Sequence, residues 1–134
     1  AQLSPTARAA LYNADRLVIC PSNPIVSIGP LLALDELAQI VRSRREDVVA
    51  VSPIIAGKAL KGPADRLMTE LGHDASVLGV ARIYAPYAAT FAIDQADAEL
   101  APAIEDVGMR CVVTATVMSD LDAAQKLAAT VLGA

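Results

Sequence analysis

The sequence of 134 residues contains no tryptophan, a single phenylalanine and a single histidine. With so few aromatic residues, the core must be filled by valine, isoleucine, leucine and alanine, and a hydrophobic content of 54% is sufficient for that. One histidine and two cysteines without Cys-x-x-Cys spacing argue against a zinc site and against a disulfide framework. We therefore expect Cys20 and Cys111, each in a short apolar run, to be buried reduced thiols.

Charge and hydrophobicity exclude two further classes of partner. The net charge of -4 argues against a general nucleic-acid surface, because such a surface requires clustered lysine and arginine. No apolar run approaches the roughly 20 residues of a membrane-spanning helix, and no signal peptide is visible. We expect a cytoplasmic protein that binds neither nucleic acid nor membrane.

Short apolar runs alternate with helical patterns along the whole chain. Runs without polar alternation, such as Val48–Val51, are typical of parallel strands that are covered on both faces. The expected strands are 17–20, 48–51, 90–93 and 110–114; the expected helices cover 31–41, 63–71 and 96–108 and also follow Ser4, Ser76 and Ser119. With right-handed crossovers, this order predicts an α/β, Rossmann-like, doubly wound and mainly parallel sheet.

The order of elements also predicts how the chain is organised. No linker, repeat or low-complexity tract divides it, so residues 1–134 form a single α/β segment. The first expected element is a helix, whereas such folds commonly open on a strand and a glycine-rich turn. We therefore expect an incomplete fold, the C-terminal part of a larger protein, in which that N-terminal strand and turn are missing.

Ligands of open parallel sheets bind beyond the carboxyl ends of the strands, where three expected loops lie: CPSNPIVSIGP, SPIIAGKALKGPAD and TATVMSD. In the first, CPSNPIVSIGP, the side chains of Ser22, Asn23 and Ser27 are donors and Gly29 permits close approach of the backbone. The helix that follows would present free N–H groups to a phosphate. Alternatively, Ser22 and Asn23 form a turn and Ser27 caps the helix. The residue types favour neither interpretation.

The second loop contains Gly57 and Gly62 at the spacing of a phosphate-binding Walker A loop. Pro63 and Ala64 stand where that loop requires lysine and serine or threonine, so this assignment is rejected. The two lysines between the glycines, Lys58 and Lys61, can hold a polyanion as mobile point charges, although solvated surface lysines are the commoner case. Asp65 is either an acid at a helix start or a polar contact to a ligand.

Three blocks of the sequence together resemble one known family. PSNPIVSIGP, SPIIAGKALKGPAD and LGVARIYAPYAATFAIDQADAEL are similar, in order and spacing, to the 2-phospho-L-lactate transferases of deazaflavin coenzyme F-420 biosynthesis. The resemblance covers nearly the whole chain. It implies transfer of a 2-phospholactyl or phosphoenolpyruvyl group from a GDP-activated donor to 7,8-didemethyl-8-hydroxy-5-deazariboflavin, with release of GMP and with help from Mg²⁺.

The resemblance also implies site residues for this segment. Ser22, Asn23, Ser27 and Gly29 would form a nucleotide or phosphate loop; Lys58, Lys61, Gly62 and Asp65 would form a second wall of the cleft. It identifies no catalytic residue and no metal ligand here. Members of the family are often homodimers.

Two other functions stay open beside the transferase. A nucleotide-sugar-binding regulator of the gluconeogenesis-factor type would share the fold, but the KGPAD block favours the transferases. A non-catalytic fragment, whose loops are only turns, is the other alternative. If the protein is a transferase, with either a phospholactyl or a phosphoenolpyruvyl donor, we expect this segment alone to be inactive, because its active site is completed elsewhere.

Overall fold

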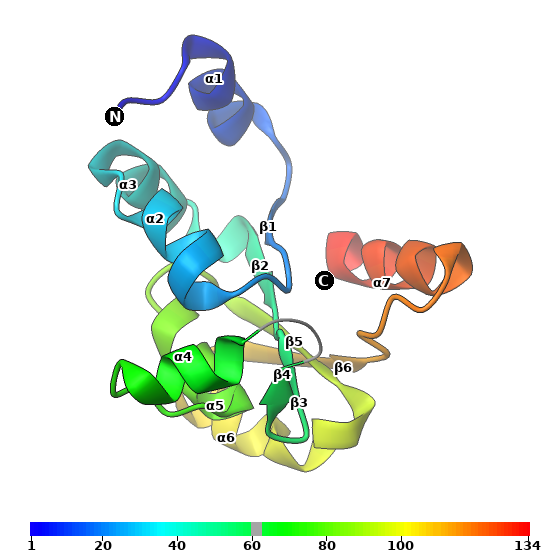
Figure 1. The fold of residues 1–134 in the computed structure, drawn as a ribbon. Coiled ribbons are helices and arrows are strands. Elements are labelled where there is room, and N and C mark those ends of the chain that lie inside the picture. The colour runs from blue at the N-terminus through cyan, green and yellow to red at the C-terminus, as the bar shows by residue number, and fades with distance from the viewer. Residues whose placement is uncertain (60–62) are drawn as a thin grey trace.

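A parallel sheet of four strands lies at the centre of the computed structural model, which describes residues 1–59 and 63–134 (Figure 1). In spatial order the strands are β1 (Leu17–Ile19), β2 (Val48–Val51), β5 (Thr90–Asp94) and β6 (Arg110–Thr114). All of β2 and the first four residues of β5 are buried, because helices cover both faces of the sheet. The predicted Rossmann-like parallel α/β fold is confirmed.

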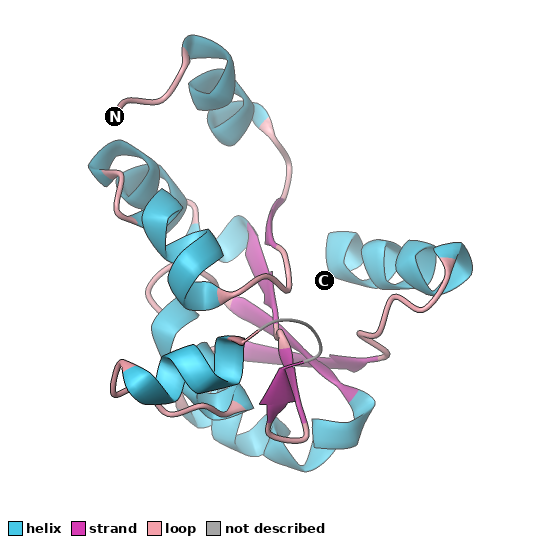
Figure 2. Cartoon of the chain, viewed as in Figure 1, coloured by secondary structure: helices cyan, strands magenta, loops and turns pink. Residues whose placement is uncertain are grey.

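The helices form two layers of unequal thickness on the two faces (Figure 2). The thicker layer consists of α2 (Gly29–Leu32), α3 (Asp35–Ser43), α4 (Ala64–Glu70), α5 (Val77–Tyr84) and α6 (Ala101–Asp106). The opposite face is covered by α7 (Leu121–Gly133). Outside the thicker layer, α1 (Pro5–Asn13) has no buried residue and contacts α3, where the Arg8 guanidinium donates to both oxygens of Glu36.

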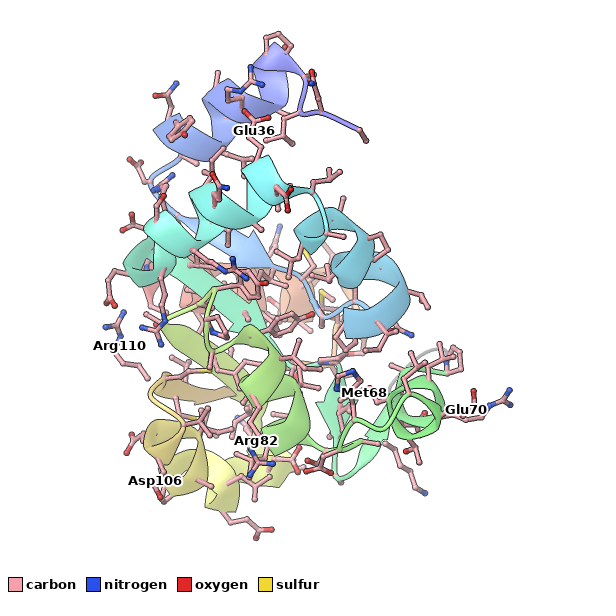
Figure 3. All side chains as sticks on the ribbon, turned by 90° about the vertical axis from the view of Figure 1, so that its left-hand side faces the viewer. Glu36, Met68, Glu70, Arg82, Asp106 and Arg110 are labelled. Carbon is pink, nitrogen blue, oxygen red and sulfur yellow. The ribbon has the colours of Figure 1, made fainter. Side chains whose placement is uncertain are left out.

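Side chains of the central strands divide between two cores, because successive residues of a strand point to opposite faces. Val48, Ala50, Phe91 and Ile93 pack against the thicker layer, and Met68 of α4 lies in the same core. Figure 3 shows Met68 and Glu70 at different sides of α4; the former is buried and the latter exposed. The smaller core joins β2 and β5 to α7.

The two outer strands explain a wrong prediction about the cysteines. β1 ends at Ile19, so Cys20 follows the strand and is exposed. Cys111 lies in β6 and is half-buried. Because β1 and β6 are edge strands, each has a neighbouring strand on one side only. The apolar runs beside both cysteines do form strands, but these are the outer strands of the sheet, where side chains are less buried than in the central strands.

Local structure differs from the expectation at several points, and the helix expected over 31–41 is divided between α2 and α3. The first loop is largely helical: the π-helical turn η1 (Pro24–Ile28) runs directly into α2. A short antiparallel hairpin of β3 (Ile54–Ile55) and β4 (Lys58–Ala59) follows β2. Asp120, not Ser119, caps α7 through the N–H of Ala123.

Two further short helical turns link the larger elements. They are η2 (Arg45–Asp47) before β2 and η3 (Gln95–Leu100) after β5. Within the described residues, no single helix is long and apolar enough to cross a membrane. One pair, Pro24–Leu32 with Asp35–Ser43, has that length and composition, but across a bend of 92°.

Candidate functional site

A cavity of about 380 Å³ lies at the carboxyl edge of the sheet. Its walls come from the segments that follow β1, β2 and β6, the same three loops that the sequence placed at this edge. Parallel strands end at a common edge, so these loops meet although they are far apart along the chain. The lining residues are Pro21, Asn23, Ser52, Pro53, Ile55, Ala64, Thr116, Val117, Met118 and Ser119.

Asn23 forms part of the first wall and is held in one orientation by the backbone. Its Oδ1 accepts hydrogen bonds from the N–H groups of Ile25 (2.9 Å) and Val26 (3.2 Å), so it caps the helical turn η1. The amide nitrogen Nδ2 is buried and has no hydrogen-bond partner among the described residues. A buried donor without an acceptor costs free energy.

Ser52 opens the second wall immediately after β2 and is buried. Its Oγ donates to the carbonyl of Ile54 at 2.9 Å and accepts from the N–H of the same residue at 3.2 Å. The hydroxyl therefore turns the chain sharply between β2 and the β3–β4 hairpin. Because both hydrogen bonds of the Ser52 hydroxyl are made to Ile54, Ser52 contributes to the cavity by shaping this wall.

The third wall is held by Asp94, the last residue of β5. Its Oδ2 accepts from the N–H (2.9 Å) and the hydroxyl (3.1 Å) of buried Thr116, and its Oδ1 accepts from the N–H of Ala96 at 2.9 Å. Burial alone raises the pKa of Asp94, but the hydrogen bonds from Ala96 and Thr116 outweigh it and lower the pKa below its usual value. The charged carboxylate thus fixes the start of the Thr116–Ser119 wall.

The hairpin in the second wall has an unusual backbone. Ala56 and Gly57, the two residues between its strands, have φ of 50° and 78°. A two-residue turn with both φ positive matches the twist of a hairpin, but alanine adopts such a φ reluctantly. The N–H of Ala56 donates to both carboxylate oxygens of Asp97, at 3.1 and 3.0 Å, and Asp97 is only 6% exposed.

The predicted residues of the first loop lie in different environments. Asn23 lines the cavity. Ser22 is half-buried and its N–H donates to the carbonyl of Cys20, while Ser27 is exposed within η1. Gly29 is helical, and a Cβ added there would lie 3.1 Å from the carbonyl oxygen of Pro24. The close approach at Gly29 is therefore to the chain's own backbone.

The predicted residues of the second loop are less completely placed. Lys58 is exposed on β4. Asp65 is half-buried in the first turn of α4, where its Oδ1 accepts from the N–H of Arg66 at 2.9 Å. Lys61 and Gly62 lie outside the described residues. Ala64 lines the cavity, so α4 begins at its wall.

The polar groups that line the described part of the cavity are amides and hydroxyls, between apolar walls. Proline, isoleucine, valine and methionine side chains provide these walls, which suit a flat or apolar group, and the polar atoms can orient it. Over residues 1–59 and 63–134, no three His, Cys, Asp or Glu side chains gather as metal ligands would.

Sequence reasoning missed Ser52, Asp94, Asp97 and Thr116 as parts of this site. Asp94 and Asp97 read as the acidic start of a helix, which needs no further partner. Their position in the sequence could have identified two of them, because Ser52 directly follows β2 and Asp94 is the last residue of β5. The bond from Asp97 to Ala56 joins residues 41 positions apart, and local sequence does not predict it.

A parallel α/β sheet with a loop-lined cavity beyond its carboxyl edge defines a protein of Rossmann-like architecture. Within that class the chain belongs to the family of 2-phospho-L-lactate transferase CofD, which it matches over residues 1–131. The family predicted from the loop blocks is thereby confirmed.

Relatives in this family carry two names. The 2-phospho-L-lactate transferase of Methanosarcina barkeri is 38% identical over 133 residues, which are 99% of this chain and 42% of that protein. The enzyme of the same name from Methanocaldococcus jannaschii is 37% identical over 92% of this chain and 38% of its own length. The phosphoenolpyruvate transferase of Kitasatospora aureofaciens is 34% identical over 98% and 41%. The chain thus spans about two fifths of each of these relatives.

Proposed function

We propose that the intact protein transfers a 2-phospholactyl or phosphoenolpyruvyl group from a GDP-activated donor to 7,8-didemethyl-8-hydroxy-5-deazariboflavin and releases GMP, as a step of coenzyme F-420 biosynthesis. Family membership over residues 1–131 supports the transferase class. The observation that carries the proposal is the cavity at the carboxyl edge, which Asn23 lines with a side chain fixed by η1 and with an amide nitrogen that has no partner among the described residues.

The reaction is a phosphoryl-type transfer. A hydroxyl oxygen of the deazariboflavin chain forms a bond to the phosphorus that carries the lactyl or enolpyruvyl group. The bridging bond from that phosphorus to the GMP oxygen breaks, GMP takes the electron pair, and the hydroxyl proton passes to solvent or to a base. Such transfers depend mainly on positioning and on neutralising phosphate charge. No described residue is assigned as the base.

Within this reaction the predicted loops hold the donor. Asn23 donates its Nδ2 hydrogens to an oxygen of the donor, while Ser22, Ser27 and Gly29 lie along the same loop. Lys58, Lys61 and Gly62, with Asp65 at the start of α4, flank the phosphates from the second loop. Mg²⁺ would neutralise phosphate charge when bound. Because the described residues do not gather into a metal site, no step is assigned to it here.

The setting of the reaction is part of the same proposal. The protein acts in the cytoplasm as a homodimer, on a soluble donor and acceptor, and this segment alone is inactive. Size-exclusion chromatography with light scattering on the intact protein tests the dimer, and a monomer at micromolar concentration would contradict it. GMP release by residues 1–134 alone would contradict the inactivity of the segment.

The decisive experiment supplies the intact protein with Mg²⁺, the deazariboflavin and either the lactyl or the enolpyruvyl GDP-activated donor. We expect GMP release that depends on the acceptor and is faster with one donor. Asn23→Asp keeps an oxygen to cap η1 but removes the donor, so it should reduce GMP release by roughly 10- to 100-fold, the effect of one hydrogen bond to a charged group.

Gln39→Glu is the matched control. It makes the same amide-to-carboxylate exchange on the exposed side of α3, away from the cavity, and should leave the rate unchanged. Absence of GMP release with both donors, from a folded protein with Mg²⁺ present, would overturn the proposed function. An Asn23→Asp protein with the wild-type rate would instead overturn the role given to Asn23.

A further inference from the structure

Two acidic residues beside the cavity hold two of its walls without lining it. Asp94 ends β5, and Asp97 follows three positions later inside η3. Asp94 accepts two hydrogen bonds from Thr116, 22 positions away, at the base of the third wall. Asp97 accepts the N–H of Ala56, 41 positions away, in the hairpin of the second wall.

Helix capping alone does not account for this arrangement. Asp94 uses Oδ1 to cap η3 through Ala96, and its other oxygen is directed to Thr116. Asp97 is only 6% exposed, whereas a carboxylate that only complements a helix end normally stays in solvent. Burial of a carboxylate is costly unless hydrogen bonds compensate it. The long-range bonds to Thr116 and Ala56 are therefore the distinctive feature of both residues.

The bond from Asp97 also stabilises a backbone that alanine adopts reluctantly. A non-glycine residue with the φ of Ala56 (50°) costs on the order of 1 kcal/mol and persists only where its surroundings impose it. The hairpin carries Lys58 on its second strand, and Ile55 at the end of its first strand lines the cavity. The geometry of this turn therefore sets where Ile55 and Lys58 lie relative to the cavity.

We propose that Asp94 and Asp97 are positioning residues that set the separation of the second and third walls of the cavity from one rigid segment between them. The inference rests on the proposed function for its kinetic consequences. Neither Asp94 nor Asp97 lines the cavity. Each acts through the backbone that it holds, so its loss should weaken substrate binding more than it slows the chemical step.

The kinetic test uses the intact protein and the GMP-release assay. Asp97→Ala should raise the KM of at least one substrate by about 10-fold while kcat changes by less than about 3-fold, the pattern of lost ground-state binding. Asp97→Asn keeps one oxygen for the Ala56 N–H and should restore most of the affinity. Glu99→Ala is the matched control, an exposed acid two residues on in the same turn, and should change neither constant.

A second substitution separates positioning from general destabilisation. Glycine adopts a φ near 50° without strain, so adding Ala56→Gly to Asp97→Ala should reverse part of the rise in KM. A merely structural role for Asp97 would predict recovery of melting temperature without recovery of KM. Unchanged KM values in both Asp97→Ala and Asp94→Ala, in folded proteins, would overturn the proposal.

Hydrogen exchange distinguishes failure of this inference from failure of the proposed function, because it needs no activity. In Asp97→Ala the amide of Ala56 should exchange faster while that of Thr116 stays protected; in Asp94→Ala the order should reverse. If the wild-type protein releases no GMP but this selective pattern appears, the positioning role stands and the transferase assignment falls. If neither amide changes its exchange rate, the positioning role falls whatever the activity.

Discussion

The amino ends and the carboxyl ends of the strands form two opposite edges of the sheet, and side chains of opposite hydrogen-bonding character bind the backbone at these edges. At the amino edge, the Arg45 guanidinium donates to the carbonyls of Ala85 (2.7 Å) and Gly108 (2.8 Å), where α5 and α6 have ended. At the carboxyl edge, the side chains of Asn23 and Asp94 accept N–H groups at the starts of η1 and η3. One edge thus carries a donor for free carbonyls, and the other carries acceptors for free N–H groups.

This difference follows from the direction of the crossover helices. α5 and α6 run antiparallel to the strands, so their carboxyl ends reach the amino edge and present unpaired carbonyls. Helix starts lie at the carboxyl edge and present unpaired N–H groups with partial positive charge. An anionic or acceptor-rich ligand therefore has its complement at the carboxyl edge, where the cavity between the loops lies.

Gly79 at the carboxyl-edge start of α5 gives the largest expected effect. A Cβ added there would lie 1.8 Å from the carbonyl oxygen of Asp74, which is backbone and cannot rotate away. We expect Gly79→Ala to lower the free energy of unfolding of the intact protein by about 3 kcal/mol or more, measured by urea titration. Gly133→Ala in α7 is the control, because nothing lies within 4 Å of its added Cβ. Equal stability of the two variants would contradict the close packing of α5.

Removing the hydrogen bonds of Arg45 at the amino edge should have the next largest effect on the free energy of unfolding. Arg45→Met keeps most of the side-chain volume but leaves the carbonyls of Ala85 and Gly108 without their donor, at a cost of about 1.5–3 kcal/mol. Arg110→Met removes an exposed arginine whose partner is Glu46 at 3.3 Å, and should cost less than about 0.5 kcal/mol. Figure 3 shows Arg110 extending from the molecule. Chemical denaturation of both variants separates the two roles.

The corresponding change at the carboxyl edge should depend on pH. Because the folded-state pKa of Asp94 is lowered, its carboxylate stabilises the fold above the unfolded pKa of about 4, and this contribution is lost as pH falls through the folded value. Asp94→Ala should therefore cost about 1 kcal/mol near pH 7, and the difference from wild type should shrink below about pH 4. A difference that stays constant from pH 7 to pH 3 would contradict the charged role.

The smallest effect concerns a buried hydroxyl near the amino edge. The hydroxyl of Tyr84, in the last turn of α5, is buried without a hydrogen-bond partner in the described part of the chain, and burial raises its pKa. Tyr84→Phe removes the unpaired group and should leave stability unchanged or raise it by up to about 1 kcal/mol. Tyr12→Phe on exposed α1 should change nothing. A clear loss of stability in Tyr84→Phe, seen in thermal unfolding, would reveal a partner for the hydroxyl.

Much of the fold and part of the site could be predicted from local sequence. The apolar run Val48–Val51 reads as a central parallel strand, and Ser4 and Ser76 read correctly as helix caps. The meeting of three loops at one edge also followed, since it is a consequence of parallel strands. The π-helical turn that Asn23 caps in the first loop was not predicted, because such a turn has no reliable signal in residue types.

What the sequence alone determined is therefore the four strands of the main sheet, their parallel direction and the edge at which a ligand would bind, because apolar periodicity and chain connectivity are local properties. Tertiary structure alone decided that Asp94 holds Thr116, that Asp97 holds Ala56 and that Arg45 joins two helix ends. Each of these contacts depends on unpaired backbone groups that come together only when separate helices and strands pack. The walls of the cavity belong to this second kind of information.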